Sequence, residues 1–299
     1  MMAKTIVVTG ASSGFGKGVA QRLAEQGHNL VLAARRGELL EELAREIGHA
    51  IAVPTDVANP DEVHYLGERA KAEYGRIDVW INDAGVGTIG RFTDLPLRDQ
   101  ISVVETNLIG ALNGTYVAMQ QFVEHGEGTL INVASVAGKV AMPYFAVYGG
   151  TKSAILSMSA SIRRELELNG QDNIHVCVVN PWATDTSFFE HGSNYTRHSL
   201  RMPMIDDPEI VVDAIVGLID DPKDEVDVGV KSKGTALGSH LAPGLTEAAS
   251  AKLIHHTLME EAPLAGVTSG SVNEPVAAGT EVEGHTRERI AEEDRRKES

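Results

Sequence analysis

The sequence predicts an α/β protein built on a doubly wound parallel sheet. Over roughly the first 230 residues, short runs of β-branched and aliphatic residues alternate with longer segments of helical period. Uninterrupted apolar runs of this length are typical of parallel strands covered on both faces, and strict β-α alternation favours right-handed crossovers. With 299 residues of which 42% are hydrophobic, the chain can form one large domain with appendages.

Seven runs are the predicted strands because each is short, apolar and bounded by Gly, Asn, Asp or Pro. They are Thr5–Thr9, Asn29–Ala33, Ala50–Val53, Val79–Asn82, Thr129–Val133, Ile174–Val179 and a last short one near Glu225–Val228. The segments between them carry apolar residues at helical spacing, which predicts helices. These are Gly16–Gln26, Glu38–Ile47, Asp61–Tyr74, Leu97–Glu124, Ala146–Asn169 and Asp207–Ile219.

Three segments do not follow this alternation. Residues 181–208 are rich in aromatics, Gly and Asn without clear period, which is typical of a mobile lid over a site. Residues 231–261 contain an amphipathic stretch, Leu241–Leu258, and predict a helical extension that needs a surface to cover. Residues 262–299 are polar, charged and turn-rich, and we expect them to be disordered when alone. The expected division is therefore a catalytic domain over 1–230, an extension and a tail.

Charge and composition exclude several classes of function. A net charge of -16 opposes nucleic-acid binding, because that binding depends on clustered Lys and Arg. No apolar run reaches the ~20 residues of a transmembrane helix and no signal-peptide pattern is visible, so we expect a cytoplasmic protein. Cys177 reads as a small buried hydrophobe, and the 11 histidines form no spaced ligand set, so no metal is predicted.

A glycine-rich loop joins the first strand to the first helix. It runs Thr9-Gly10-Ala11-Ser12-Ser13-Gly14-Phe15-Gly16. Glycines there let the backbone approach a pyrophosphate, and a helix N-terminus supplies free N–H groups and partial positive charge. A nucleoside-triphosphate loop is a poor match, because Gly18 stands where that motif needs a hydroxyl and Ala11 replaces its opening glycine. Context favours a dinucleotide over an ordinary turn.

The end of the second strand carries two arginines, Arg35 and Arg36, after Ala34. NAD-binding folds place an acidic residue at about this distance from the glycines, where it binds the ribose diol. Two guanidinium groups suit a 2′-phosphate instead, which predicts NADP with NADPH preferred over NADH. The alternative is an ordinary basic pair at the start of a helix.

Tyr148 and Lys152 begin a predicted helix and lie four residues apart, hence on one face. A free phenol titrates at about 10, so proton exchange near neutrality needs a neighbouring cation worth roughly 4 kcal/mol, and Lys152 can provide it. Taken alone, the pair also fits a buried Tyr beside a Lys that extends to solvent.

These segments, taken together and in order, resemble the short-chain dehydrogenase/reductase family over about residues 3–230, in its NADP-preferring branch with a Tyr-x-x-x-Lys active site. The matching segments are Thr9–Gly16, Asn82-Asp83-Ala84-Gly85, Asn107, Ile131–Ser135, Tyr148 with Lys152, and Asn180-Pro181. The resemblance implies a Rossmann fold and the catalytic residues Asn107, Ser135, Tyr148 and Lys152. Tyr148 would exchange the proton, Ser135 would bind the substrate oxygen, Lys152 would bind the nicotinamide ribose and tune Tyr148, and Asn107 would hold a relay water. Helix capping by Ser135 and a kink-site amide at Asn107 are the alternatives.

The resemblance also predicts which residues bind cofactor and substrate. The expected cofactor residues are Gly10, Ser12, Ser13, Gly14, Phe15, Gly16, Arg35, Arg36, Asp56, Val57, Asn82, Ala84, Gly85, Tyr148, Lys152, Pro181, Thr184 and Thr186. Asp56 could equally be a helix N-cap. The expected substrate pocket comprises Val136, Pro143, Tyr144, Trp182, Phe188 and Phe189. Two positions depart from the family pattern: Asp83 replaces a common Asn, and Trp182 replaces a usual Gly, where pocket lining and packing are equally good explanations.

The predicted function is hydride transfer between NADP(H) and a carbonyl or secondary alcohol of a small apolar or aromatic compound. The alternatives are an epimerase or dehydratase that retains NAD, and a redox-sensing NADP(H)-binding protein without turnover. The first normally needs a larger domain after the sheet, and the second has no need of Ser135, Tyr148 and Lys152 together. The resemblance further implies a homodimer or homotetramer, which associates through the long helices.

Overall fold

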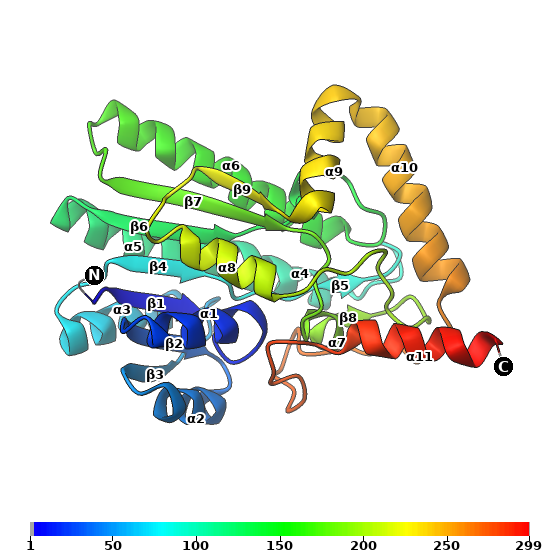
Figure 1. The fold of residues 1–299 in the computed structure, drawn as a ribbon, viewed down its shortest axis with the longest axis horizontal. Coiled ribbons are helices and arrows are strands. Elements are labelled where there is room, and N and C mark those ends of the chain that lie inside the picture. The colour runs from blue at the N-terminus through cyan, green and yellow to red at the C-terminus, as the bar shows by residue number, and fades with distance from the viewer. Residues whose placement is uncertain (1–2, 299) are drawn as a thin grey trace.

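A computed structural model describes residues 3–298 and contains one seven-stranded parallel sheet (Figure 1). The strands are β1 Thr5–Thr9, β2 Asn29–Ala34, β3 Ala50–Pro54, β4 Val79–Asn82, β6 Gly128–Val133, β7 Ile174–Pro181 and β9 Glu225–Val228. Their order is β3-β2-β1-β4-β6-β7-β9, so the chain winds outward in one direction from β1 and in the other from β4. The predicted doubly wound sheet and all seven predicted strands are confirmed.

Both faces of the sheet are buried, which explains why most strand positions are apolar; the edge strand β9 is the exception, with Glu225 and Asp227. Ile6 and Val8 of β1 lie in one core cluster and Val7 lies in the other, because successive side chains point to opposite faces. Trp80 and Phe122 are the largest side chains without exposed surface, and both belong to the second cluster.

Helices cover the two faces of the sheet. They are α1 Gly14–Glu25, α2 Gly37–Ile47, α3 Pro60–Tyr74, α4 Leu97–Val104, α5 Gly110–His125, α6 Ala146–Leu168 and α8 Glu209–Gly217. Helices α1, α2 and α8 bury their apolar sides in the first cluster, and α3, α5 and α6 in the second. None of the helices within residues 3–298 combines the length and apolarity needed to cross a bilayer.

The long helix predicted over Leu97–Glu124 is present but contains a widened turn. Residues Glu105–Ile109 form a single π-helical turn between α4 and α5, and the backbone stays helical at both joints. Such π-bulges occur frequently at functional sites. Here the turn contains Asn107, which is buried.

The segment between β7 and α8 contains two short elements that the sequence pattern did not reveal. Helix α7 spans Phe188–His191, and strand β8, Ser193–Asn194, pairs in parallel with β5, Thr88–Ile89. Two-residue strands carry no readable alternation, so sequence alone gives no signal for them. The pairing holds the segment against the loop after β4.

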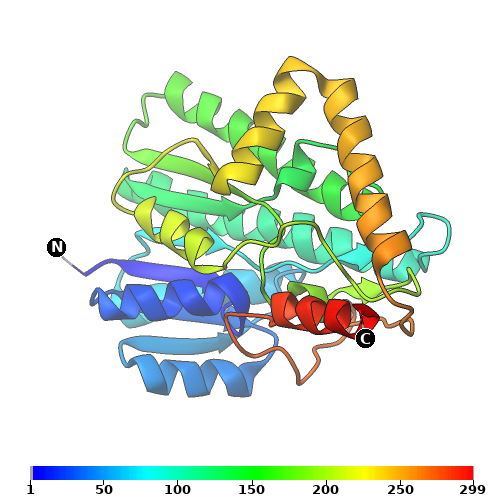
Figure 2. The ribbon, with the colours of Figure 1, turned by 45° about the vertical axis from the view of Figure 1, so that its right-hand side comes forward.

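The C-terminal quarter of the chain contains more helix and more long-range contacts than the sequence pattern reveals. Two helices, α9 Gly229–Leu241 and α10 Pro243–His255, form a bent pair that projects from the sheet and continues into a π-helical segment, His256–Glu261 (Figure 1). Ile254 and Leu258 are buried at its base, whereas Leu241 and Leu245 are about three-quarters exposed. The chain then returns along the carboxyl ends of the strands and ends in α11, Thr286–Glu298 (Figure 2). The sequence predicts disorder there because these contacts are polar and long-range and leave no apolar period.

Candidate active site

A cavity of about 230 Å³ lies at the carboxyl ends of the parallel strands, where open α/β sheets bind their ligands. Most of the predicted site residues line this one cavity. Of the residues predicted to bind the cofactor, those on its wall are Gly10, Ser12, Ser13, Gly14, Phe15, Arg35, Arg36, Asp56, Val57, Ala84, Gly85, Tyr148, Lys152, Pro181, Thr184 and Thr186. Ser135 and the predicted pocket residues Val136, Trp182, Phe188 and Phe189 line it as well.

Five of the predicted residues lie off the cavity wall. Gly16, Asn82 and Asn107 lie behind it, and Pro143 and Tyr144 lie outside it. The first three have structural contacts, described below, that position residues of the wall. The Tyr144 hydroxyl instead bonds His255 Nδ1 at 2.5 Å, which ties the loop before α6 to α10.

Ser135, Tyr148 and Lys152 converge in the cavity from two elements. Ser135 follows β6 and accepts a hydrogen bond from the Ala137 amide at 3.1 Å, so it does cap a short 3₁₀ turn, Val136–Gly138. Tyr148 and Lys152 project from the first turns of α6, and Lys152 Nζ lies 5.7 Å from the centre of the Tyr148 ring. Lys152 Nζ donates to the Val133 carbonyl at 2.7 Å, which fixes the ammonium beside the strand end.

Burial keeps the Tyr148 phenol protonated and brings the pKa of Lys152 close to neutral pH. Burial raises the pKa of Tyr148 to about 12, and a hydrogen bond from Ser135 opposes that rise. Burial lowers the pKa of Lys152 to about 8, against the attraction of Asp83. At neutral pH the site therefore presents a neutral phenol, a hydroxyl in contact with it, and a cation.

Asn107 joins the π turn to two parts of the site. Its Oδ1 accepts from the Val86 amide at 2.8 Å, and its Nδ2 donates to the Val86 carbonyl at 2.9 Å and to Thr151 Oγ1 at 3.3 Å. The amide therefore clamps the loop after β4 to the helix turn that carries Lys152. A widened helical turn is what directs this side chain inward.

Asp83, which stands where the family commonly has Asn, interacts electrostatically with the same centre. Burial raises the pKa of Asp83 to about 7, while the Lys152 charge and a hydrogen bond from the Gly16 amide lower it. Its neighbour Asn82 has a structural role: it accepts from Trp80 Nε1 at 2.8 Å and donates to Asn132 Oδ1 at 2.9 Å, inside the sheet.

The glycine-rich loop provides close backbone approach at the cofactor end. Gly10 adopts φ +75°, and a Cβ there would lie 2.9 Å from the Ala84 nitrogen, so only glycine fits between the two strand ends. Gly14 and Phe15 begin α1 and line the cavity, with their amides at the positive end of the helix. This arrangement fits the pyrophosphate of a dinucleotide.

Arg35 and Arg36 stand at the rim of the cavity without a carboxylate partner within residues 3–298. Arg36 Nε and Nη2 bond Ser12 Oγ at 3.1 and 3.0 Å, and Nη2 also bonds Ser13 Oγ at 2.9 Å. Burial lowers the pKa of Arg36, and the Arg35 charge lowers it further. Two guanidinium groups that have only neutral acceptors fit an anionic ligand.

The remaining cofactor candidates hold their loops in defined conformations. Asp56 Oδ1 accepts from the Ala58 amide at 3.0 Å, whereas the N-cap of α3 is Asn59, so Asp56 does not cap that helix. Thr184 Oγ1 donates to the Trp182 carbonyl at 2.8 Å. Trp182 both lines the cavity and packs, because its Nε1 donates to the Pro203 carbonyl at 3.1 Å.

The opposite end of the cavity is apolar and aromatic. The Phe188 ring lies 5.3 Å from the Tyr148 ring, and Phe189 packs edge-on against Phe188. Sequence reasoning missed several residues that complete this end or the rim: Met142, Phe145, Met202, His191, Ser271, Pro275 and Val276. The last three come from the C-terminal segment, and no motif marks them.

Comparisons with known proteins show which family and fold this chain resembles. The family model described as short chain dehydrogenase matches residues 4–195. The Bacillus subtilis (strain 168) protein named uncharacterized oxidoreductase YxnA is 35% identical over 267 residues, which cover 87% of this chain and 75% of that protein.

Two solved structures are similar over most of their length. A short-chain dehydrogenase from Streptomyces avermitilis has a TM-score of 0.71 at 28% identity, covering 83% of this chain and 95% of its own. A short chain dehydrogenase from Burkholderia cenocepacia J2315, in complex with NADP, has a TM-score of 0.71 at 25% identity and covers 83% and 97%.

Proposed function

The chain belongs to the short-chain dehydrogenase family, and on that premise we propose that it transfers a hydride between NADP(H) and a carbonyl or secondary alcohol. The observation that carries this proposal is the convergence of Ser135, Tyr148 and Lys152 in one cavity that also contains the glycine loop. A binding protein without turnover has no need of that convergence, and this disfavours the redox-sensor alternative.

The bound nicotinamide would supply the hydride, and the chain's own residues would manage the proton. In the reducing direction Tyr148 donates its phenolic proton to the substrate oxygen while Ser135 holds that oxygen by a hydrogen bond. Lys152, fixed by the Val133 carbonyl, stabilises the phenolate that results and orients the nicotinamide ribose. In the oxidising direction the same groups act in reverse.

NADP is the proposed cofactor because of the arginine pair. No carboxylate stands at the end of β2 to hold a ribose diol, and the Nε–Nη2 edge of Arg36 is a planar fork suited to phosphate. The solved structure with NADP is consistent with this choice but belongs to another protein.

The proposed substrate is a small apolar or aromatic carbonyl compound. The rings of Phe188, Phe189 and Phe145 and the thioethers of Met142 and Met202 line the end of the cavity near Tyr148. Few charged groups lie at that end to bind a polar substrate. An epimerase or dehydratase on a sugar nucleotide fits this lining poorly.

We also propose a homo-oligomer that associates through α4 and α5. Those helices expose apolar side chains along one surface: Leu97, Ile101, Leu112, Tyr116 and Val123 are each more than two-fifths exposed. An exposed stripe of this kind is typical of a protein interface.

The test is NADPH oxidation, followed by absorbance, against a panel of aromatic and aliphatic aldehydes and ketones. We expect turnover with aromatic or branched apolar members and little with sugar nucleotides. Absence of consumption across the panel, in a folded protein that binds NADPH, would favour a binding role. Fluorescence titration with NADPH and NADH measures the cofactor choice independently of any substrate.

A further inference from the structure

The C-terminal segment crosses the mouth of the cavity, and we name residues 271–287 the strap. Ser271, Pro275 and Val276 of the strap line the same cavity as the glycine loop. Figures 1 and 2 show the segment passing the carboxyl ends of the strands before it enters α11. The strap thus forms a wall of the cofactor end and is not an independent tail.

The strap holds both guanidinium groups through backbone carbonyls. Arg35 Nη2 donates to the Ser271 carbonyl at 2.7 Å, and Arg36 Nη1 donates to the carbonyls of Ala278 at 3.1 Å and Gly279 at 3.3 Å. Carbonyls fix a guanidinium without neutralising it. The strap takes only Nη1 of Arg36 and leaves the Nε–Nη2 edge directed at the Ser12 and Ser13 hydroxyls.

Beyond the arginines, the strap is fastened to the first helix. The Glu281 carbonyl accepts from the Gly14 amide at 2.9 Å, and Lys17 Nζ bonds the Thr280 carbonyl at 3.0 Å and a Glu281 carboxylate oxygen at 3.2 Å. The strap therefore follows the rim from the end of β2 to the start of α1.

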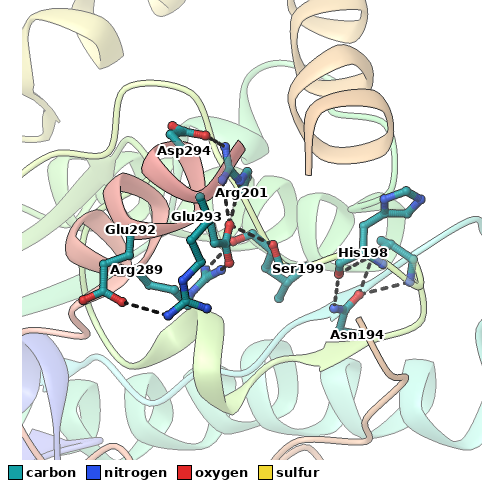
Figure 3. A network of polar contacts seen from close by, with 11 residues as sticks. Asn194, His198, Ser199, Arg201, Arg289, Glu292, Glu293 and Asp294 are labelled. Atoms are coloured by element: carbon teal, nitrogen blue, oxygen red, sulfur yellow. Dashed lines mark hydrogen bonds and ion pairs between the residues drawn. The ribbon is translucent and has the colours of Figure 1, made fainter. Parts of the chain in front are cut away.

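The far end is anchored to the opposite wall, on the segment that follows β7. Asp185 has no exposed surface and accepts from the Thr286 amide at 2.7 Å and from Arg287 Nε at 2.9 Å. Helix α11 is fixed in the same way, because the buried Arg201 bonds Glu293 and Asp294, each at 2.7 Å (Figure 3). The strap bridges the two walls between which a dinucleotide would lie.

We propose that the strap completes the adenosine half of the cofactor site, presets the arginine pair for a 2′-phosphate, and must lift for the dinucleotide to enter or leave. This inference rests on the proposed function. A free arginine side chain loses rotamer entropy on binding, and a guanidinium already held in place loses less of it. The strap occupies only Nη1, so a 2′-phosphate can replace the Ser12 and Ser13 hydroxyls on the Nε–Nη2 edge while the strap still holds the guanidinium. At its other end the Glu281 carbonyl occupies the Gly14 amide, and the strap must release that amide before a pyrophosphate can bind it.

Two glycines of the C-terminal segment provide the test, because the backbone at each lies too close to its neighbours for a side chain. A Cβ at Gly270 would lie 2.2 Å from the His191 carbonyl oxygen, and one at Gly279 would lie 2.4 Å from His191 Nε2. Both residues also have positive φ, +53° and +68°. Gly270→Ala should lift the backbone beside Ser271, which holds Arg35, and Gly279→Ala should lift the backbone that holds Arg36.

Gly266→Ala is the matched control, since a Cβ at Gly266 meets nothing within 4 Å. For all three variants and the unchanged chain, circular dichroism checks the fold, fluorescence titration gives the Kd of NADPH and NADH, and stopped-flow gives their dissociation rates. We expect Gly279→Ala and Gly270→Ala to raise the Kd of NADPH about fivefold or more, to speed its dissociation, and to reduce the NADPH:NADH preference. Gly266→Ala should match the unchanged chain.

The possible results distinguish a failure of the proposed role of the strap from a failure of the proposed cofactor choice. If either lifted variant binds NADPH more tightly than the unchanged chain, the strap is a competitor and the inference is overturned. Unchanged dissociation and unchanged preference in both folded variants would overturn it as well. If the unchanged chain binds NADPH and NADH equally, the proposed cofactor choice fails instead, and the effect of the strap is then read from the dissociation rate of either nucleotide.

Discussion

Lys152→Met should make the cofactor-free protein more stable, because burial disfavours the charged form of Lys152. Its pKa falls from 10.5 in the unfolded chain to about 8 in the folded protein. A lysine whose folded pKa is lowered destabilises the folded state at every pH below its unfolded value, and the cost fades as pH rises through that window. At 1.36 kcal/mol for each pKa unit, the cost is about 3 kcal/mol at pH 7 and about 1 kcal/mol at pH 9.5.

The substitution also removes the hydrogen bond from Lys152 Nζ to the Val133 carbonyl, which offsets about 1–2 kcal/mol of the gain. We therefore expect a net stabilisation of about 1–2 kcal/mol at pH 7 that vanishes by pH 9.5. Urea unfolding at both pH values, followed by circular dichroism, measures the difference directly.

Lys139→Met is the matched control, because Lys139 lies just before α6 and has the opposite electrostatics. Desolvation lowers the pKa of Lys139, but the hydrogen bonds that its ammonium donates to Asp227 and Glu225 outweigh that effect and raise the pKa, so this lysine stabilises the fold below its unfolded pKa. Its removal should destabilise the protein at pH 7. The reasoning fails if Lys152→Met shows no pH dependence, or if it destabilises the protein more at pH 7 than at pH 9.5.

Three further predictions concern the cofactor end and the pH profile. Arg36→Ala should weaken NADPH binding about tenfold and leave NADH binding nearly unchanged, with a difference that shrinks in high salt; equal losses for both nucleotides in titrations would contradict the phosphate assignment. The rate of carbonyl reduction should decline above about pH 8 as Lys152 loses its proton. Asp83→Asn should move that decline to lower pH, because the Asp83 carboxylate raises the pKa of Lys152. A pH–rate profile that Asp83→Asn leaves unmoved would exclude this coupling. A chain that ends at Gly229 should still unfold cooperatively, because both main core clusters lie entirely within residues 6–228. The shortened chain should bind NADPH more weakly than the full chain. Loss of cooperative melting in the shortened chain would show that the extension belongs to the core.

The sheet could be predicted because six of its seven strands are apolar runs that their own sequence marks. Tyr148 and Lys152 could be placed together for a similar reason: four residues along a helix fix their separation without any tertiary information. Predicting that Ser135 lies near the glycine loop also requires the order of the strands, since only the sheet topology brings the ends of β1 and β6 to one edge.

The strap could not be predicted, because its contacts leave no pattern in the sequence. Arg36 bonds carbonyls of Ala278 and Gly279, and any residue supplies a carbonyl. The ion pairs between Arg201 and α11 join residues about 90 apart, and a polar, turn-rich stretch is typical of disorder unless such partners are known. The inward position of Asn107 likewise depends on a π turn that no local sequence pattern predicts.

The transfer of deuterium from 4-deuterated NADPH to the carbonyl carbon of an accepted aldehyde or ketone, compared between the unchanged chain and Tyr148→Phe, tests the central claim most directly. The account predicts label in the alcohol product of the unchanged chain, and a loss of at least 10²–10⁴-fold in its rate of formation in Tyr148→Phe with NADPH binding retained. Labelled product formed by Tyr148→Phe at a near-normal rate would contradict the assignment of Tyr148 as the proton donor.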